Sequence, residues 1–219
     1  MNMIKSVFSL SAFLLLFSCL SFTKKEEVSK SKSTYIPSQE TKVAYFASGC
    51  FWCVEAIFES VKGVEEAVSG YAGGHTNNPT YKSTGTGTTG HAETVAVYYN
   101  PKIVSFKTLV TVFYGSHNPT TVNGQHPDYG SQYRSIAFYS NDEEKNIINN
   151  MIVKLNKEVY DGKIATEVTK FTKFYKAKDY HQNFEKRNPN QGYVKAVSIP
   201  RLNAFKAKFP SLLKDSEKH

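Results

Sequence analysis

The sequence predicts one α+β domain, because its composition is that of a globular chain and its apolar residues follow two different periods. Of the 219 residues, 40% are hydrophobic, 14% are aromatic and 21% are charged, which excludes a chain that is disordered throughout. Short apolar runs typical of strands alternate with amphipathic segments of helical period. We therefore expect a single folded domain with polar tails.

The order of the expected elements gives the architecture. The expected strands are residues 43–47, 64–71, 93–99, 136–139 and 168–171, and the expected helices are residues 51–62, 105–114 and a segment after Asn141. Ser105 and Asn141 are typical helix caps, and Gly63 follows the last turn of the first helix. The order β-α-β-β-α-β is typical of a ferredoxin-like core, here with an additional strand, helices and two long loops. Long loops of this kind are usually functional.

The N-terminus predicts export. Lys5 precedes an apolar run at residues 7–17, which is shorter than the roughly 20 residues of a membrane span and fits the core of a signal peptide. The run ends in Leu-Phe-Ser-Cys, which resembles a lipoprotein box with Cys19 as the acylated residue. A plain secretory signal with an incidental cysteine is the alternative. We expect residues 1–18 to be removed and residues 19–41 to form a flexible tether, giving a membrane-anchored lipoprotein or a periplasmic protein.

The rest of the chain is expected to form one domain at residues 42–210, followed by a disordered tail at residues 211–219. The formal net charge of +8 permits acidic partners. The lysines are scattered, however, and no nucleic-acid-binding module is recognisable, so the charge indicates a solvated surface. We expect a monomer with no nucleic-acid partner.

The strongest local motif is Gly-Cys-Phe-Trp-Cys, which begins at Gly49 between the first strand and the first helix. Cys50 is expected at the helix N-terminus, where free backbone N–H groups favour a thiolate, and Cys53 is expected on the same face. This spacing suits a nucleophile and a resolving thiol. Half of a zinc site, a structural disulfide and two inert buried cysteines are the alternatives. No pair of histidines has a ligand spacing, so we expect no metal.

Other polar residues carry little information by themselves. Residues 85–90 match G-x-G-x-x-G, but no strand precedes them and no helix follows, so they indicate a flexible loop and not a dinucleotide site. On local pattern alone, Glu93 is a surface carboxylate and Asp128 a turn former. Tyr81 and Tyr133 are two of 14 tyrosines, most of which are expected in packing.

Seven segments taken together resemble the peptide methionine sulfoxide reductase A family. They are GCFWCVE from Gly49, SGYAGGH from Ser69, NPTY from Asn78, TGHAE from Thr89, HNPTT from His117, DYGSQYRS from Asp128 and FYKAKDYHQNF from Phe174. They follow the order of the family and cover roughly residues 42–200. Each segment alone is weak, but their combination is specific.

The resemblance implies thiol-dependent reduction of the S epimer of methionine sulfoxide, free or in proteins. By position, Cys50 matches the nucleophile that attacks sulfur, and Glu93 matches the acid that protonates the sulfoxide oxygen. Tyr81 and Tyr133 match the hydroxyls that hold this oxygen, and Asp128 matches a supporting carboxylate. The chemistry needs a protonated acid, because an unprotonated sulfoxide oxygen is a poor leaving group, and a poorly solvated aromatic site raises a carboxyl pKa.

The resemblance also has an apolar part and two departures. Phe51 and Trp52 match the cradle for the substrate methyl group. Many family members have resolving cysteines near the C-terminus, whereas this chain has none after Cys53. Cys53 is therefore the resolving candidate, with a thioredoxin-like external reductant and no bound cofactor; direct reduction of Cys50 by an external thiol is the alternative. His126-Pro127 departs from the family pattern, and His181 has no assigned role.

Two other functions remain open on the sequence. A general thiol–disulfide oxidoreductase using the C-x-x-C pair would not need an acid at Glu93. A tethered binding lipoprotein for methionine-rich or oxidised segments would not need the Cys50 thiol for binding.

Overall fold

The computed structural model describes residues 35–218. The predicted signal peptide, the lipidation site Cys19 and most of the predicted tether lie outside these residues. Within them, no helix is both long enough and apolar enough to cross a membrane.

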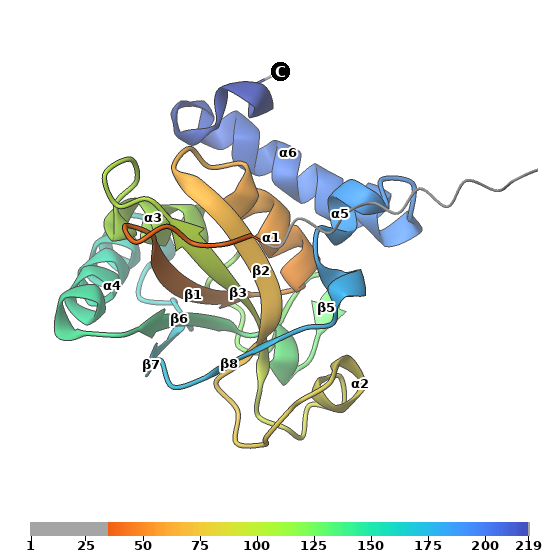
Figure 1. The fold of residues 1–219 in the computed structure, drawn as a ribbon. Helices are drawn as coiled ribbons and strands as arrows, with labels where there is room; N and C mark the ends of the chain where they lie inside the picture. Colours follow the sequence, from red (N-terminus) through yellow and green to blue (C-terminus); the bar gives the residue numbers. More distant parts are fainter. Residues whose placement is uncertain (1–34, 219) are drawn as a thin grey trace, which may run out of the picture. The chain divides into compact units, whose positions relative to one another are not determined.

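The domain is built on a six-stranded sheet with the order β7-β6-β1-β3-β2-β8 (Figure 1). The strands are β1 (Lys42–Ser48), β2 (Val64–Ala72), β3 (Ala92–Tyr99), β6 (Ser135–Tyr139), β7 (Glu167–Lys170) and β8 (Phe174–Lys176). Neighbouring strands are antiparallel except β6 and β7, which are parallel. The central order β6-β1-β3-β2, with helices after β1 and β3, is the ferredoxin-like arrangement, and this confirms the predicted α+β fold.

The helices complete the domain. They are α1 (Phe51–Glu59), α2 (Tyr81–Thr84), α3 (Phe106–Gly115), α4 (Asp142–Leu155), α5 (Phe184–Arg187) and α6 (Ile199–Lys208). Helix α1 ends three residues before the predicted end, because Val61 pairs with Leu213 and the Lys62 N–H donates to the Leu212 carbonyl. This contact buries Leu213, so the described part of residues 211–219 packs on the domain, unlike the frayed end expected from the sequence.

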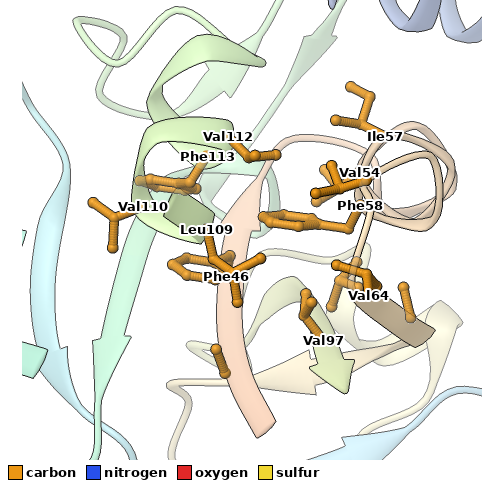
Figure 2. Close-up of a cluster of buried hydrophobic side chains, with 14 of the residues drawn as sticks. Phe46, Val54, Ile57, Phe58, Val64, Val97, Leu109, Val110, Val112 and Phe113 are labelled. Carbon is orange, nitrogen blue, oxygen red and sulfur yellow. The ribbon is translucent and has the colours of Figure 1, made fainter. Parts of the chain in front are cut away.

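Aromatic packing fixes helices α1 and α3 against one face of the sheet. The Phe46 ring of β1 stacks on Phe58 of α1 and on Phe113 of α3, with 5.2 Å between ring centroids in each pair. Figure 2 shows these rings surrounded by Val54 and Leu109. Each fully buried side chain of this kind contributes roughly 1.5–3 kcal/mol of transfer free energy. The packing therefore holds β1 and α1 in one position relative to each other.

The strand register brings three chain segments to one edge of the sheet. Phe46 pairs with Val95, so the end of β1 lies beside the start of antiparallel β3. Ser48 pairs with Ser135, which places the start of β6 at the same edge. The long loop predicted at residues 115–132 also ends there, and it contains a small hairpin of β4 (Gly124–Gln125) and β5 (Asp128–Tyr129). The predicted site residues come from these segments and the start of α1, except Tyr81, which lies on α2.

Candidate active site

Cys50 lies in the turn between β1 and α1. Gly49 has a φ of +94°, and a Cβ at this position would lie 2.9 Å from the Gln125 side chain, so only glycine fits the turn. Cys50 is the N-cap residue, with non-helical φ and ψ, and its carbonyl accepts hydrogen bonds from the Cys53 and Val54 N–H groups. This confirms the predicted position at the helix N-terminus. Its side chain is only 5% exposed.

Glu93 lies beside this turn with its carboxyl group buried. It is the second residue of β3, pairs with Tyr71 of β2 and is 3% exposed. Its Oε2 accepts a hydrogen bond of 3.0 Å from the Phe51 N–H, in the first turn of α1. Burial raises the Glu93 pKa to about 8, although the Phe51 N–H acts in the opposite direction. The site therefore holds a protonated carboxylic acid at neutral pH, unlike the solvated carboxylate that the local sequence pattern suggests.

The pKa values of the Cys50 and Cys53 thiols move in opposite directions. Burial raises the Cys50 pKa well above its ordinary value, and contacts with Cys53 and Glu93 raise it further. A hydrogen bond with Cys50 lowers the Cys53 pKa to about 6, helped by the charge of Arg201 and opposed by burial. In this arrangement the Cys50 thiol donates and Cys53 carries the charge. The helix N-terminus was expected to favour a thiolate on Cys50, but burial outweighs it.

Tyr81 and Tyr133 lie close enough to Glu93 and Cys50 that both groups raise the pKa of each tyrosine hydroxyl. Tyr81, on α2, has its pKa raised to about 12 by burial, then by Glu93 and Cys50. Burial and the same two groups raise the pKa of Tyr133, in the turn before β6. Both hydroxyls therefore remain protonated donors at neutral pH. Tyr81 is 40% exposed, which places it at the opening of the site.

Asp128 reaches the site through a tyrosine that the sequence did not indicate. The Tyr193 hydroxyl donates to Asp128 Oδ2 at 2.5 Å and lies 3.9 Å from Cys53 Sγ. Burial raises the Asp128 pKa, and this hydrogen bond lowers it. Tyr193 thus connects the hairpin residue Asp128 to the second thiol. No local pattern distinguishes it from the other tyrosines.

An aromatic wall closes one side of the site. The Trp52 ring stacks on Phe184 at 3.8 Å between centroids, and Phe51 packs against Tyr81 at 6.2 Å. The Trp52 indole N–H donates to His181 Nδ1 at 3.2 Å. An indole N–H only donates, so Nδ1 accepts and the imidazole proton is on Nε2. Burial lowers the His181 pKa to about 4, so the ring is neutral and belongs to the wall.

A buried carboxyl group fixes the segment that carries this wall. Glu55 on α1 accepts hydrogen bonds from the Ser69 hydroxyl and from the Asn183 N–H. Gln182 bonds both backbone groups of Ser69. These contacts attach residues 182–183, next to His181, to α1 and β2. No group of three or more His, Cys, Asp or Glu side chains within residues 35–218 could hold a metal ion.

Comparison with known proteins agrees with this geometry. The family model described as peptide methionine sulfoxide reductase matches residues 42–213. The chain belongs to this family. A peptide methionine sulfoxide reductase MsrA of Polynucleobacter asymbioticus is 45% identical over 171 residues, covering 78% of this chain and 90% of that protein. MsrA 1 of Rhodopirellula baltica is 46% identical over 182 residues, which cover 83% of this chain and 93% of that protein.

Solved structures of the reductase family share the fold. Reduced Mxr1 from Saccharomyces cerevisiae has a TM-score of 0.67 and 31% identity, with 73% of this chain and 92% of that chain covered. Methionine sulfoxide reductase A of Corynebacterium diphtheriae has a TM-score of 0.64 and 34% identity, with 70% and 78% covered. The predicted family is thereby confirmed, and this reductase is an oxidoreductase that acts on methionine sulfoxide.

Proposed function

We propose that the protein reduces the S epimer of methionine sulfoxide, free and in proteins, by attack of Cys50 on the sulfoxide sulfur with Glu93 as the general acid. The observation that carries this proposal is the buried Glu93 carboxyl, bonded to the Phe51 N–H in the turn next to the Cys50 thiol, where burial raises its pKa to about 8. A sulfoxide oxygen leaves only when it is protonated, and an acid with a pKa near the working pH is suited to that transfer. A general thiol–disulfide exchanger has no oxygen leaving group to protonate, so it would not need Glu93 for this step.

The remaining groups match the other parts of the substrate. The hydroxyls of Tyr81 and Tyr133 stay protonated and can donate to the sulfoxide oxygen as negative charge develops on it. The rings of Phe51 and Trp52 offer an apolar surface for the S-methyl group. Asp128, held by the Tyr193 hydroxyl, supports the site from the hairpin.

The reaction leaves the oxygen on the enzyme. As Cys50 attacks, its proton passes to Cys53 along their hydrogen bond. Cys50 becomes a sulfenic acid as methionine is released, and Cys53 then condenses with it to a disulfide and water. Both sulfurs lie in the first turn of α1 and interact in the reduced state, which supports Cys53 as the resolving thiol. A thioredoxin-like protein then reduces the disulfide, with no bound cofactor. Acylation of Cys19, export and a monomeric state are part of the same proposal.

Mass spectrometry after one equivalent of S-epimer N-acetyl-methionine sulfoxide tests this function. The fully reduced protein, freed of dithiothreitol, is expected to release one N-acetyl-methionine and to lose about two mass units as Cys50 and Cys53 link. Cys53→Ser is expected to gain about sixteen mass units, as a sulfenic acid. A folded, reduced sample that releases no methionine would refute the reductase. Sulfenic acid without a disulfide in the wild type would instead remove Cys53 from the mechanism.

A further inference from the structure

Arg201 carries a positive charge that no carboxylate neutralises within hydrogen-bonding distance in the described part of the chain. This α6 side chain donates from Nε to the Ser116 carbonyl and from Nη2 to the Ser48 carbonyl, both at 2.8 Å. None of the ion pairs found among residues 35–218 includes it. A partly buried guanidinium that is bonded only to neutral carbonyls favours a nearby anion. Its charge also lowers the pKa of the Asp128 carboxyl, which forms no ion pair with it within the described residues and which the Tyr193 hydroxyl binds.

This guanidinium lies against the turn that carries the nucleophile. Its Nη1 is 3.3 Å from the position that a Cβ on Gly49 would occupy, and Ser48, whose carbonyl it binds, ends β1. The same C-terminal segment, residues 193–201, brings the Tyr193 hydroxyl to 3.9 Å from Cys53 Sγ. The C-terminal segment therefore contacts both the turn before Cys50 and the second thiol.

The groups that act on the Cys53 sulfur come from every element around it. They are Cys50 at the start of α1, Glu93 on β3, and Tyr193, Ser198 and Arg201 from the C-terminal segment. Among these five, Arg201 is the group with a positive charge. Glu93 is held protonated by burial and adds no negative charge at neutral pH.

We propose that Arg201 is the counter-charge of the thiolate in the Cys50–Cys53 pair and keeps Cys53 ionised for its attack on the Cys50 sulfenic acid. This inference rests on the proposed function. In the step, the Cys53 thiolate forms the S–S bond, the Cys50 S–O bond breaks, and the hydroxide leaves as water with one proton from solvent. The two thiols thus supply the two electrons that reduce the sulfoxide.

The contribution of Arg201 is greatest after the first step. In the reduced protein, the hydrogen bond from Cys50 is the largest cause of the lowered Cys53 pKa, and the charge of Arg201 adds to it. Oxidation of Cys50 removes that S–H donor, whereas the guanidinium stays in place. Arg201 is therefore a positioning and electrostatic residue for the resolving step and does not contact the sulfoxide.

Single-turnover kinetics of Arg201→Gln test the inference, because glutamine keeps N–H donors but has no charge. Methionine release and disulfide formation are followed separately at pH 7. We expect methionine release to stay within about twofold of wild type. Disulfide formation is expected to slow by about tenfold, because loss of the Cys50 S–H donor raises the Cys53 pKa above 7, where each further pH unit lowers the thiolate fraction about tenfold. Arg201→Lys is expected to restore most of the rate. Lys208→Gln, which removes one charge from an exposed position of the same helix, is the matched control.

The pH dependence separates an electrostatic role from a structural one. Raising the pH to about 9 ionises Cys53 without help, so disulfide formation in Arg201→Gln is expected to recover towards wild type. Equal slowing of both steps, slowing that does not recover with pH, or no slowing would each overturn the inference. A wild type that releases methionine but forms no disulfide would overturn it too. Absence of any methionine would instead refute the proposed function.

One measurement needs no variant that might fail to fold. The reduced wild-type protein at pH 7 is expected to lose the 240 nm absorbance of one thiolate per chain when substrate converts the pair to the disulfide. No loss of thiolate absorbance in a sample that forms the disulfide would overturn the inference. A Cys50→Ser background then reports Cys53 alone, and adding Arg201→Gln is expected to move its titration upward by about one pH unit.

Discussion

Replacement of the buried acid, Glu93→Gln, is the most informative perturbation because it changes activity and stability in opposite directions. The glutamine side-chain oxygen can still accept the hydrogen bond from the Phe51 N–H, and it has nearly the same volume. The variant cannot donate a carboxyl proton. We therefore expect methionine formation to fall by roughly 10²- to 10⁴-fold, the usual contribution of a general acid.

The stability change follows from the pKa of Glu93. In the unfolded chain this carboxyl ionises near its ordinary value of 4.5, whereas in the folded protein it keeps its proton up to about pH 8. Folding therefore takes up a proton between these values, and wild-type stability falls as the pH rises from 4.5 to 8. At pH 7 the raised Glu93 pKa lowers the free energy of unfolding of the wild type by about 3 kcal/mol. Above pH 8 this loss approaches about 5 kcal/mol. Glutamine does not titrate, so the variant avoids this cost.

Urea unfolding of both reduced proteins at several pH values measures the effect. The stability of Glu93→Gln minus that of wild type is expected to increase by roughly 3 kcal/mol between pH 5 and pH 8, because the other titrations cancel in the difference. The wild-type rate should also decline above about pH 8 as the acid loses its proton. A stability difference independent of pH, or one that decreases as the pH rises, would show that Glu93 is ionised in the folded protein.

Three further variants test other contacts. Tyr193→Phe removes the hydroxyl next to Cys53, and we expect disulfide formation to slow roughly 2- to 10-fold in single-turnover assays, the value of one hydrogen bond. His117→Gln tests acid sensitivity: burial lowers the His117 pKa to about 3, so the unfolded chain binds its proton first and wild-type stability falls below pH 6.5. In urea unfolding, the free energy of unfolding of the wild type relative to that of His117→Gln is expected to fall by roughly 3 kcal/mol from pH 7 to pH 4. Leu109→Ala opens a cavity at a fully buried site, and calorimetry should show a loss of roughly 2–5 kcal/mol.

Local patterns were sufficient for the centre of the fold. The apolar period after Cys50 predicts α1. The side chains of Ser105 and Asn141 each accept a hydrogen bond from the third N–H of their helix, which confirms both predicted caps. Strand order followed from the β-α-β-β-α-β succession, because connection rules restrict how such elements pair. The end of α1 was misplaced, since the pairing of Val61 with Leu213 joins segments far apart in the chain.

The site was predictable only through the combination of segments that resembles a family. Nothing in the residues around Glu93 indicates that its carboxyl is buried, because the burial depends on β3 lying next to the end of β1. Tyr193 and Arg201 were missed for the same reason: each acts on Cys53 through contacts between the C-terminal segment and α1. Contacts of this kind leave no periodic signal in a sequence.

Burial alone does not decide which group in this site carries charge. Glu93 and Cys53 are both excluded from solvent, which disfavours their ionised forms, yet Glu93 stays neutral and Cys53 is the thiolate. The difference lies in their partners. Glu93 accepts one backbone hydrogen bond and is next to anionic groups, whereas Cys53 accepts from Cys50 and lies within the field of Arg201. The protein thus keeps a proton for the sulfoxide oxygen and a negative charge for the resolving sulfur in one buried site: burial holds the proton on Glu93, and the hydrogen bond from Cys50, with the charge of Arg201 adding to it, favours the thiolate of Cys53.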